Sequence, residues 1–315
     1  MDTTHGTHSS RVTDGTRGTD SSHVTDGHPL PPGTDPEQLR LLAVRLAAEA
    51  GRLLLEHRRG VVSVARTKST ATDVVTAADL AAERRVRELL AAERPDDGVL
   101  GEEEAALTGT SGLTWVVDPL DGTVNYLYGT GSYAVSVAVV AGPPRPDAWR
   151  AVAGAVLDVE RGQTFSATAG GGARLDGPLP GGEHADGLPL EASGCTSLAA
   201  CLLGTGFGYD AGVRAEQGRA VAELLPRVRD VRRVGAAALD LCMVAAGRLD
   251  AYVERGLHPW DHAAGVLVAR EAGAVVTGPD GGPVDARLCV AAAPGVAAEL
   301  DRAVRESGYS PHHLP

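Results

Sequence analysis

A short apolar run that ends in carboxylates constrains the fold of this chain more than any other stretch. Residues 115–117 read Trp-Val-Val, and residues 118–125 continue as Asp-Pro-Leu-Asp-Gly-Thr-Val-Asn. An unbroken run of β-prone apolar residues favours a buried strand, and because proline cannot donate to a sheet, we expect the chain to turn at Pro119. Asp118 and Asp121 would then leave the sheet together, at an edge where an active site can form.

The next two residues add groups that suit an anion. Gly122 allows the backbone to approach a ligand closely, and Thr123 can cap a following helix whose free N–H groups favour a phosphate. Carboxylates for a cation would therefore lie beside amides for a phosphate. The alternative is an ordinary Asp-Pro and Asp-Gly turn, which turn chemistry explains without any function.

Charge and composition narrow the range of partners. The net charge of −12 and the 3% of aromatic residues argue against a surface that binds nucleic acid, and an anionic substrate would need metal cations to offset this charge. No apolar run approaches the roughly 20 residues that span a bilayer, and the N-terminus lacks the apolar segment of a signal peptide. We therefore expect a cytoplasmic protein with no membrane partner. The cysteines lack metal-binding spacing and are expected to be reduced: Cys195, Cys201, Cys242 and Cys289.

The chain divides into a tail and two ordered parts. Residues 1–34 are rich in Thr, Gly, Asp, Ser and His and offer almost nothing apolar to bury, so we expect a disordered low-complexity tail. Residues 35–185 open with a helix capped at Asp35 and a strand expected over 61–65. They continue as an antiparallel meander, which the glycines 170–172 should close. Residues 186–315 alternate strand and helix, beginning with a strand expected over 198–203, as in an α/β layer.

Further acidic residues have an ordinary explanation as well as a functional one. Asp79 lies three residues after Thr76, which is the spacing of a helix-capping pair. Glu102 opens a Glu-Glu-Glu run of the kind that usually lies on a solvated face. Asp261 lies at the start of an expected helix, where aspartate commonly caps the amides, and Glu254 ends an expected strand beside a turn. Their local patterns alone require no site.

Four stretches together resemble the signatures of the inositol monophosphatase family. Residues 118–125 match its Asp-Pro-x-Asp-Gly-Thr-x-Asn string. The other matches are Asp-x-Val-Thr-x-x-Asp at 73–79, Gly-Glu-Glu at 101–103 and Trp-Asp-x-Ala-Ala-Gly at 260–265. The resemblance covers residues from about 36 to 305. It implies a layered αβαβα sandwich of mixed α+β and α/β character, and a homodimer.

The resemblance also implies roles for particular residues. The implied metal ligands are Glu102, Asp118, the Leu120 carbonyl, Asp121 and Asp261. The implied catalytic residues are Glu102 and the pair Asp79 and Thr123, which orient the attacking water. The implied substrate contacts are Gly122, Thr123, Glu254 and Asp261. Such an all-oxygen ligand set suits Mg²⁺, with two or three ions per site, and the family implies sensitivity to lithium. One departure is Ala236, which stands where family members commonly carry Ser or Thr.

From this resemblance we expect Mg²⁺-dependent hydrolysis of a small phosphate monoester by an activated water. Inositol 1-phosphate is the first candidate, because the family's inositol-specific members place a glutamate at the position of Glu254. A carboxylate also suits a cationic amine, so histidinol phosphate is the runner-up. Sugar bisphosphates are less favoured, since Arg255 is the one basic residue in this segment. The contrasting hypothesis is a non-catalytic regulator that keeps the fold.

Overall fold

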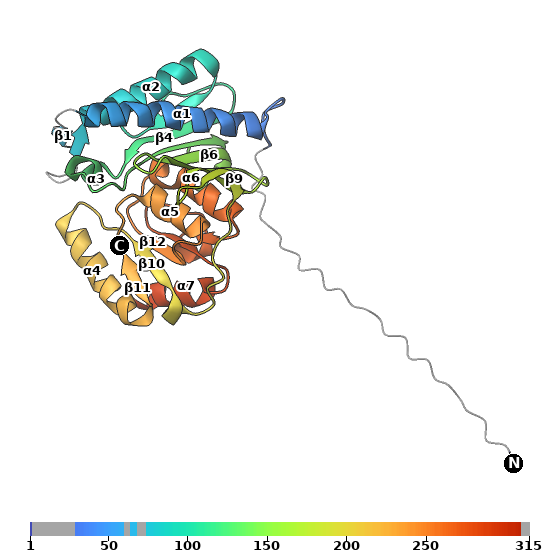
Figure 1. The fold of residues 1–315 in the computed structure, drawn as a ribbon, viewed down its shortest axis with the longest axis vertical. Helices are drawn as coiled ribbons and strands as arrows, with labels where there is room; N and C mark the ends of the chain where they lie inside the picture. The colour runs from blue at the N-terminus through green and yellow to red at the C-terminus, as the bar shows by residue number, and fades with distance from the viewer. Residues whose placement is uncertain (2–28, 60–63, 68–73, 310–315) are drawn as a thin grey trace.

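The chain forms alternating layers of helices and sheets (Figure 1). The computed structural model describes residues 1, 29–59, 64–67 and 74–309. Helices α1 and α2 cover one face of a seven-stranded sheet, α5 and α6 separate it from a five-stranded sheet, and α4 and α7 lie on the far face of that second sheet. The αβαβα order implied by the resemblance is confirmed. The helices are α1 (Pro36–Arg58), α2 (Ala77–Glu93), α3 (Thr123–Tyr128), α4 (Ala211–Leu224), α5 (Ala237–Ala245), α6 (Pro259–Glu271) and α7 (Ala297–Glu306).

Local capping sets where the first two helices begin. The Asp35 carboxylate accepts hydrogen bonds from the amides of Glu37 and Gln38, at 2.9 and 3.4 Å. Helix α2 begins with the reciprocal pair Thr76 and Asp79. Both starts were predicted from the sequence and are confirmed.

The seven-stranded sheet is a meander that runs further than the sequence indicated. Its order is β3-β4-β5-β6-β7-β8-β9, with the β3–β4 pair parallel and the other pairs antiparallel. Gly170 and Gly172 have φ angles of 75° and 78° and form the turn between β7 and β8, so the expectation that they close the meander is wrong. The strands are β3 (Gly98–Gly101), β4 (Leu113–Asp121), β5 (Ala134–Ala141), β6 (Arg150–Asp158), β7 (Gln163–Thr168), β8 (Ala173–Pro178) and β9 (His184–Pro189).

Strand β4 does not turn away at Pro119, contrary to the sequence expectation. Strand β3 pairs with β4 only as far as Val117, so Pro119 lies where β4 has no partner on that side. On the other side a bulge separates the pairs that Asp118 and Asp121 make with β5. A proline is tolerated at such a position because no ladder bond is required of it. The two carboxylates therefore project from the end of the strand itself.

The second sheet is mixed and has the order β11-β10-β12-β14-β13. The strand expected over 198–203 is a short 3₁₀ turn, η1 (Leu198–Ala200), followed by β10. The chain continues beyond the predicted elements with β13, β14 and α7. The strands are β10 (Leu202–Thr205), β11 (Asp230–Arg232), β12 (Ala251–Glu254), β13 (Val275–Thr277) and β14 (Cys289–Ala292).

The expected boundary between residues 185 and 186 falls within β9, which is paired with β8. We propose a division after Pro189 instead, because it keeps the seven-stranded sheet whole. The tail expected at 1–34 lies largely outside the described residues. The strand expected over 61–65 is described only from Val64, in β1 (Val64–Thr67), which pairs with β2 (Val74–Thr76).

Small side chains let α6 pack closely on the first sheet. A Cβ at Gly154 of β6 would come within 3.3 Å of the Ala264 Cα in α6. Ser136 of β5, which is paired with Asp118, donates to the Trp260 carbonyl at 3.2 Å. The start of α6 is therefore held against the end of β4.

The structure also bears on the state of the cysteines and on the length and character of the helices. All four cysteines are free, as expected. Among the described residues, no helix combines the length and apolar character needed to cross a bilayer.

Candidate active site

The end of β4 brings two carboxylates and a carbonyl together. Asp118 is 2% exposed, and its Oδ1 accepts the Leu120 N–H at 2.9 Å. Asp121 is 9% exposed, and its Oδ2 accepts the Ala238 N–H at 2.7 Å. Asp121 thus serves the amides at the start of α5, on the other half of the molecule. Because a carboxylate has several lone pairs, both side chains retain acceptor capacity for a further ligand.

Glu102 and Asp261 complete an acidic cluster with these two residues. Burial, and then the charges of Glu102, Asp121 and Asp261, raise the pKa of Asp118 well above its ordinary value. Burial raises the pKa of Asp121 to about 7, against opposing backbone hydrogen bonds and with help from Glu254 and Glu102. Burial also raises the pKa of Asp261 well above its ordinary value, followed by Glu102 and Asp121. The structure thus brings the four sequence-predicted carboxylate ligands within electrostatic reach of one another.

This donor set fits a hard divalent cation. The four carboxylates and the Leu120 carbonyl offer only oxygen, which suits Mg²⁺. No ion pair within the described part of the chain joins Asp118, Asp121 or Asp261 to an arginine or lysine. Among the described residues, no three His, Cys, Asp or Glu side chains lie close enough together to hold a metal ion as they stand. Cation binding would therefore draw the carboxylates closer and offset their charge.

Asp79 both caps its helix and reaches the end of β4. Its carboxylate accepts the Thr76 N–H at 2.9 Å and also the Thr76 hydroxyl. The Thr123 hydroxyl lies 3.2 Å from Asp79 Oδ1 and 3.1 Å from the Leu120 carbonyl oxygen. Burial raises the pKa of Asp79 to about 6, although the bonds from Thr76 lower it. The capping role and the predicted catalytic role are thus compatible in one side chain.

Thr123 is the first residue of α3 and not its cap, contrary to the sequence expectation. The capping position belongs to Gly122, whose φ is 88°. A Cβ at Gly122 would lie 2.9 Å from the Ser132 carbonyl oxygen, so this position requires glycine. The sequence expectation overlooked Asn125, whose side-chain amide donates to the carbonyls of Ser132 and Val234, at 2.7 and 2.9 Å. Asn125 is the last residue of the signature string, which was its only signal.

Asp261 lies at the third position of α6 and is not the residue that caps it. The cap is His258, whose N–H donates to Asp261 Oδ2 at 2.7 Å. This bond partly offsets the cost of burying the carboxylate. Trp260 is packed against the core, and its ring stacks on His258 with centroids 5.0 Å apart.

Glu254 lies at the end of β12, beside a second buried carboxylate that the sequence did not single out. The Tyr252 hydroxyl donates to Glu254 Oε2. Burial raises the pKa of Glu254 to about 7, while Tyr252 and Arg233 lower it. A Cβ at Gly206 would lie 1.9 Å from Glu254 Oε2, so glycine makes room for the carboxylate. The buried neighbour is Asp240, whose pKa is raised by its burial and then by Glu254.

Ala236 occupies the capping position of α5 and offers no side-chain acceptor. A serine or threonine there would be placed to cap α5. In this chain the Asp121 carboxylate accepts from the Ala238 amide instead. The missing hydroxyl is therefore compensated structurally.

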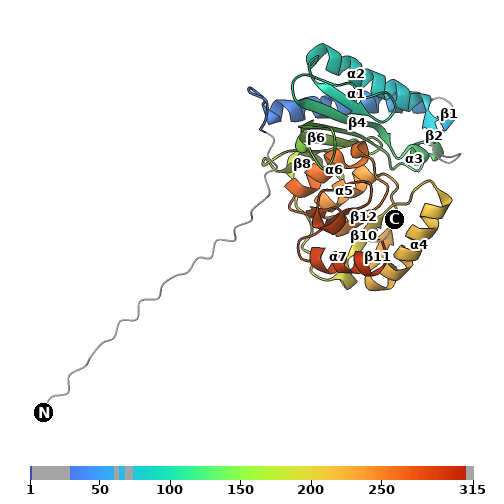
Figure 2. The ribbon, with the colours of Figure 1, turned by 180° about the vertical axis from the view of Figure 1, so that it is seen from behind.

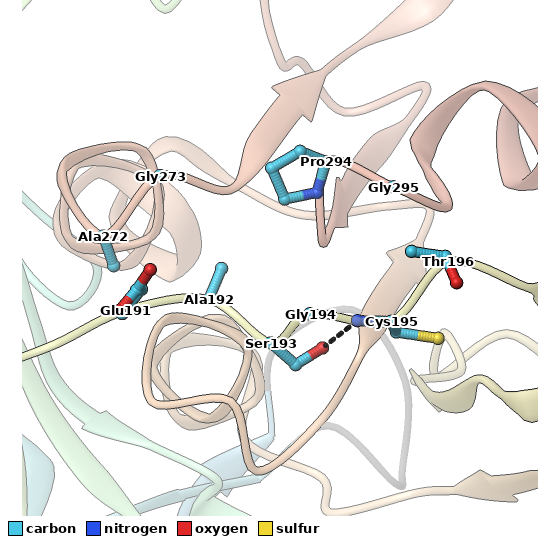
Figure 3. Close-up of a pocket in the computed structure, with 10 residues that line it drawn as sticks. All are labelled: Glu191, Ala192, Ser193, Gly194, Cys195, Thr196, Ala272, Gly273, Pro294 and Gly295. Carbon is cyan, nitrogen blue, oxygen red and sulfur yellow. Dashed lines mark hydrogen bonds between the residues drawn. The ribbon is translucent and has the colours of Figure 1, made fainter.

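A surface pocket of about 660 Å³ lies apart from this site. Figure 3 shows the segment that follows β9 on one side, with the segments after α6 and β14 on the other. None of the sequence-predicted site residues lines it, so we assign it no part in phosphate chemistry. Its lining consists of Glu191, Ala192, Ser193, Gly194, Cys195, Thr196, Ala272, Gly273, Pro294 and Gly295.

Comparison with known proteins assigns the chain to a family. Residues 35–309 match the model of the inositol monophosphatase family. The inositol-1-monophosphatase SuhB of Mycobacterium tuberculosis is 44% identical over 297 residues, covering 89% of this chain and 98% of the relative. The Nus factor SuhB of Escherichia coli is 37% identical, covering 76% and 85%.

Solved structures give the same result. Mycobacterium tuberculosis SuhB superposes with a TM-score of 0.71 at 44% identity, covering 87% of this chain and 98% of that one. The inositol monophosphatase of Anabaena superposes with a TM-score of 0.73 at 31% identity, covering 87% and 97%. The predicted family is confirmed: the chain belongs to the inositol monophosphatase family and is a phosphoric monoester hydrolase.

Proposed function

We propose that the chain hydrolyses inositol 1-phosphate to inositol and phosphate, with two or three Mg²⁺ ions bound at the end of β4. The observation that carries the metal site is the cluster of Glu102, Asp118, Asp121 and Asp261, in which burial first, and then the charges of neighbouring carboxylates, raise the pKa values of Asp118, Asp121 and Asp261. The Leu120 carbonyl is the fifth proposed ligand. Relatives at 44% identity that are named inositol-1-monophosphatase support the substrate.

Bound Mg²⁺ would supply Lewis acidity, which lowers the pKa of water, offsets charge on the phosphate and stabilises the leaving alkoxide. The chain's own contribution to the nucleophile is the pair Asp79 and Thr123. The Thr123 hydroxyl has one proton and two acceptors in reach. Donation to Asp79 leaves the Leu120 carbonyl free for a cation and leaves the hydroxyl lone pairs free to accept from the attacking water.

The amides of Gly122 and Thr123 are the proposed contacts for the phosphate. They follow the carboxylates of β4 directly in sequence, so a phosphate held there would lie beside the cations. The conformation of Gly122, which a side chain would strain, keeps this approach open.

Glu254 is the proposed contact for ring hydroxyls on the side away from the phosphate, and Asp261 borders the same space. Arg233 is close enough to lower the pKa of Glu254. That positive charge would repel the amine of histidinol phosphate, whereas a neutral polyol meets no such penalty. Arg233 therefore favours inositol 1-phosphate over the runner-up.

The test is kcat/KM for inositol 1-phosphate, histidinol phosphate and fructose 1,6-bisphosphate, in wild type and Glu254→Gln. We expect inositol 1-phosphate to be preferred, and Glu254→Gln to lower its kcat/KM about tenfold, or about 1.4 kcal/mol. Glu223→Gln, on the exposed face of α4, is the control and should change nothing. A tenfold preference for histidinol phosphate would overturn the inositol assignment and leave the phosphatase assignment standing.

The remaining family properties belong to the same proposal. We propose a homodimer that is inhibited by Li⁺ at millimolar concentrations, to be checked by sedimentation and by turnover with added LiCl. The cytoplasmic location stays a prediction. A purely non-catalytic role, as in the contrasting hypothesis, is disfavoured by the intact set of carboxylates, and phosphate release that depends on added Mg²⁺ would exclude it.

A further inference from the structure

A buried carboxylate outside the acidic cluster holds the segment that carries Glu102. Glu83, in α2, is fully buried. Its Oε2 accepts the Glu103 N–H at 2.7 Å, and its Oε1 accepts the Glu104 N–H at 3.1 Å. These are the two amides that directly follow Glu102. One carboxylate therefore fixes the backbone immediately after a proposed metal ligand.

Arg87 also holds the segment after Glu102, through a backbone carbonyl of that segment. Its Nε donates to Glu83 Oε1 at 2.8 Å, one helical turn away, and its guanidinium also donates to the Glu104 carbonyl at 3.1 Å. Gly101 completes the fit, because a Cβ there would lie 2.3 Å from Glu83 Oε1. The backbone before and after Glu102 is thus shaped around the Glu83 carboxylate.

Stability alone is a weak reason for such an arrangement. Burying an ion pair costs desolvation free energy that the attraction between the charges often fails to exceed, so apolar residues can serve a core equally well. By contrast, one carboxylate that accepts hydrogen bonds from two consecutive amides fixes the orientation of the backbone segment to which they belong. Partners that orient ligands in this way commonly set the affinity of a metal site.

We propose that Glu83 is a positioning residue that directs the Glu102 carboxylate toward Asp118 and Asp261 and thereby sets the affinity of this end of β4 for divalent cations. The inference rests on the proposed role of Glu102 as a ligand. It goes beyond that role by assigning the orientation of the ligand to a residue of α2.

The test measures Mg²⁺ binding directly, by isothermal titration calorimetry on the purified full chain without substrate. Glu83→Gln keeps the size of the side chain but has one acceptor oxygen where two amides need acceptors. We expect its Kd for Mg²⁺ to rise by about tenfold or more. In turnover assays its half-saturating Mg²⁺ concentration should rise by the same factor, and kcat should recover at saturating Mg²⁺.

Asp97→Asn is the matched control. Asp97 is a buried carboxylate near the start of β3 that accepts from the Arg94 guanidinium and from the Trp115 indole, at 2.8 Å each. Among the described residues, its side chain bonds to Arg94 and Trp115 and not to the segment after Glu102. Its substitution should lower the melting temperature and leave the Kd for Mg²⁺ within twofold of wild type.

A Glu83→Gln protein that melts lower but binds Mg²⁺ within twofold of wild type would overturn the proposal. If that variant does not fold, Arg87→Gln serves instead, since it removes the donor to the Glu104 carbonyl and should also weaken Mg²⁺ binding. Unchanged binding by folded Arg87→Gln would then overturn the proposal. Wild-type protein that binds Mg²⁺ but leaves inositol 1-phosphate intact would contradict the proposed function alone, because the calorimetric comparison would still decide the role of Glu83.

Discussion

Among the described residues, two sets of buried carboxylates differ in their partners. The first set lies next to an arginine three or four residues away, in the pairs Asp97 with Arg94, Asp158 with Arg161 and Glu83 with Arg87. Asp118 and Asp121 are equally buried, yet their described partners are backbone amides and other carboxylates. Burial alone therefore does not mark a site. Among the described residues, Asp118 and Asp121 differ from these three pairs in having no ion pair with an arginine or lysine.

Asp121→Asn should have the largest effect on function. We expect kcat/KM for phosphate release to fall at least about 100-fold, or about 2.7 kcal/mol, because a proposed ligand is lost. The amide oxygen can still accept the Ala238 N–H, and removing the charge relieves repulsion, so the metal-free melting temperature should not fall. Asp158→Asn is the paired counterpart, which should melt lower through loss of its bond to Arg161 but keep its activity.

Phosphate-release kinetics and scanning calorimetry on the two variants test this contrast. Near-wild-type turnover by Asp121→Asn would remove the end of β4 from the mechanism.

The stability of the metal-free protein should depend on pH through its buried carboxylates. The pKa values of Asp121 and Glu254 are raised to about 7 from ordinary values of 3.8 and 4.5, so the folded state binds their protons more tightly than the unfolded chain. This contribution is absent above pH 7, grows as the pH falls below 7, and is complete near pH 4. Each unit of pKa is worth about 1.4 kcal/mol, so the melting temperature should rise between pH 8 and pH 5.

Melting curves with and without Mg²⁺ check this expectation. Mg²⁺ should stabilise the protein most at pH 8, where the carboxylates are ionised, and should flatten the pH dependence. A metal-free melting temperature that stays constant or falls from pH 8 to pH 6 would contradict the raised pKa values of Asp121 and Glu254.

His262 is a buried group that would become positively charged on protonation. It is buried, its Nε2 has no hydrogen-bond partner among the described residues, and its ring lies 6.3 Å from that of Trp149. Burial, with a smaller contribution from Arg270, lowers its pKa to about 4 from 6.5. The neutral ring is therefore favoured in the fold, and stability is lost as the pH falls from about 6.5 toward 4.

Urea unfolding of wild type and His262→Leu at pH 7.5 and 4.5 measures this loss. Between pH 7.5 and pH 4.5, the free energy of unfolding of the variant should increase relative to that of wild type by up to about 2.5 kcal/mol. An equal difference at both pH values would show that the ring finds a partner for its proton.

Ala236→Ser should have the smallest effect on stability. It tests whether Asp121 compensates for the missing cap of α5. A serine hydroxyl can cap α5, which is worth up to about 1 kcal/mol when no other acceptor is present. Since Asp121 already accepts from Ala238, we expect a gain well below that value. Combined with Asp121→Ala, the same serine should give the larger gain. Equal gains in both backgrounds, measured by thermal melting, would show that Asp121 does not compensate for the missing cap.

Interactions between residues close in sequence were predictable. The Asp35 cap, the Thr76–Asp79 pair and most strands of the meander follow from turn residues, proline and periodicity within a few positions. The signature strings at 101–103, 118–125 and 260–265 identified the family, and the proposed ligands came from them.

Contacts between distant parts of the chain decided the rest. Pro119 stays in β4 because β3 ends opposite Val117, which no property of the proline itself reveals. Glu83 meets the segment after Glu102 only because α2 packs against β4, the strand paired with β3, and Asp121 reaches Ala238 across 117 residues. The sequence by itself therefore determined the family, the helix starts and the kinds of oxygen ligand present. The tertiary structure decided which buried carboxylates have a cation beside them, because that depends on packing between distant segments and not on local pattern.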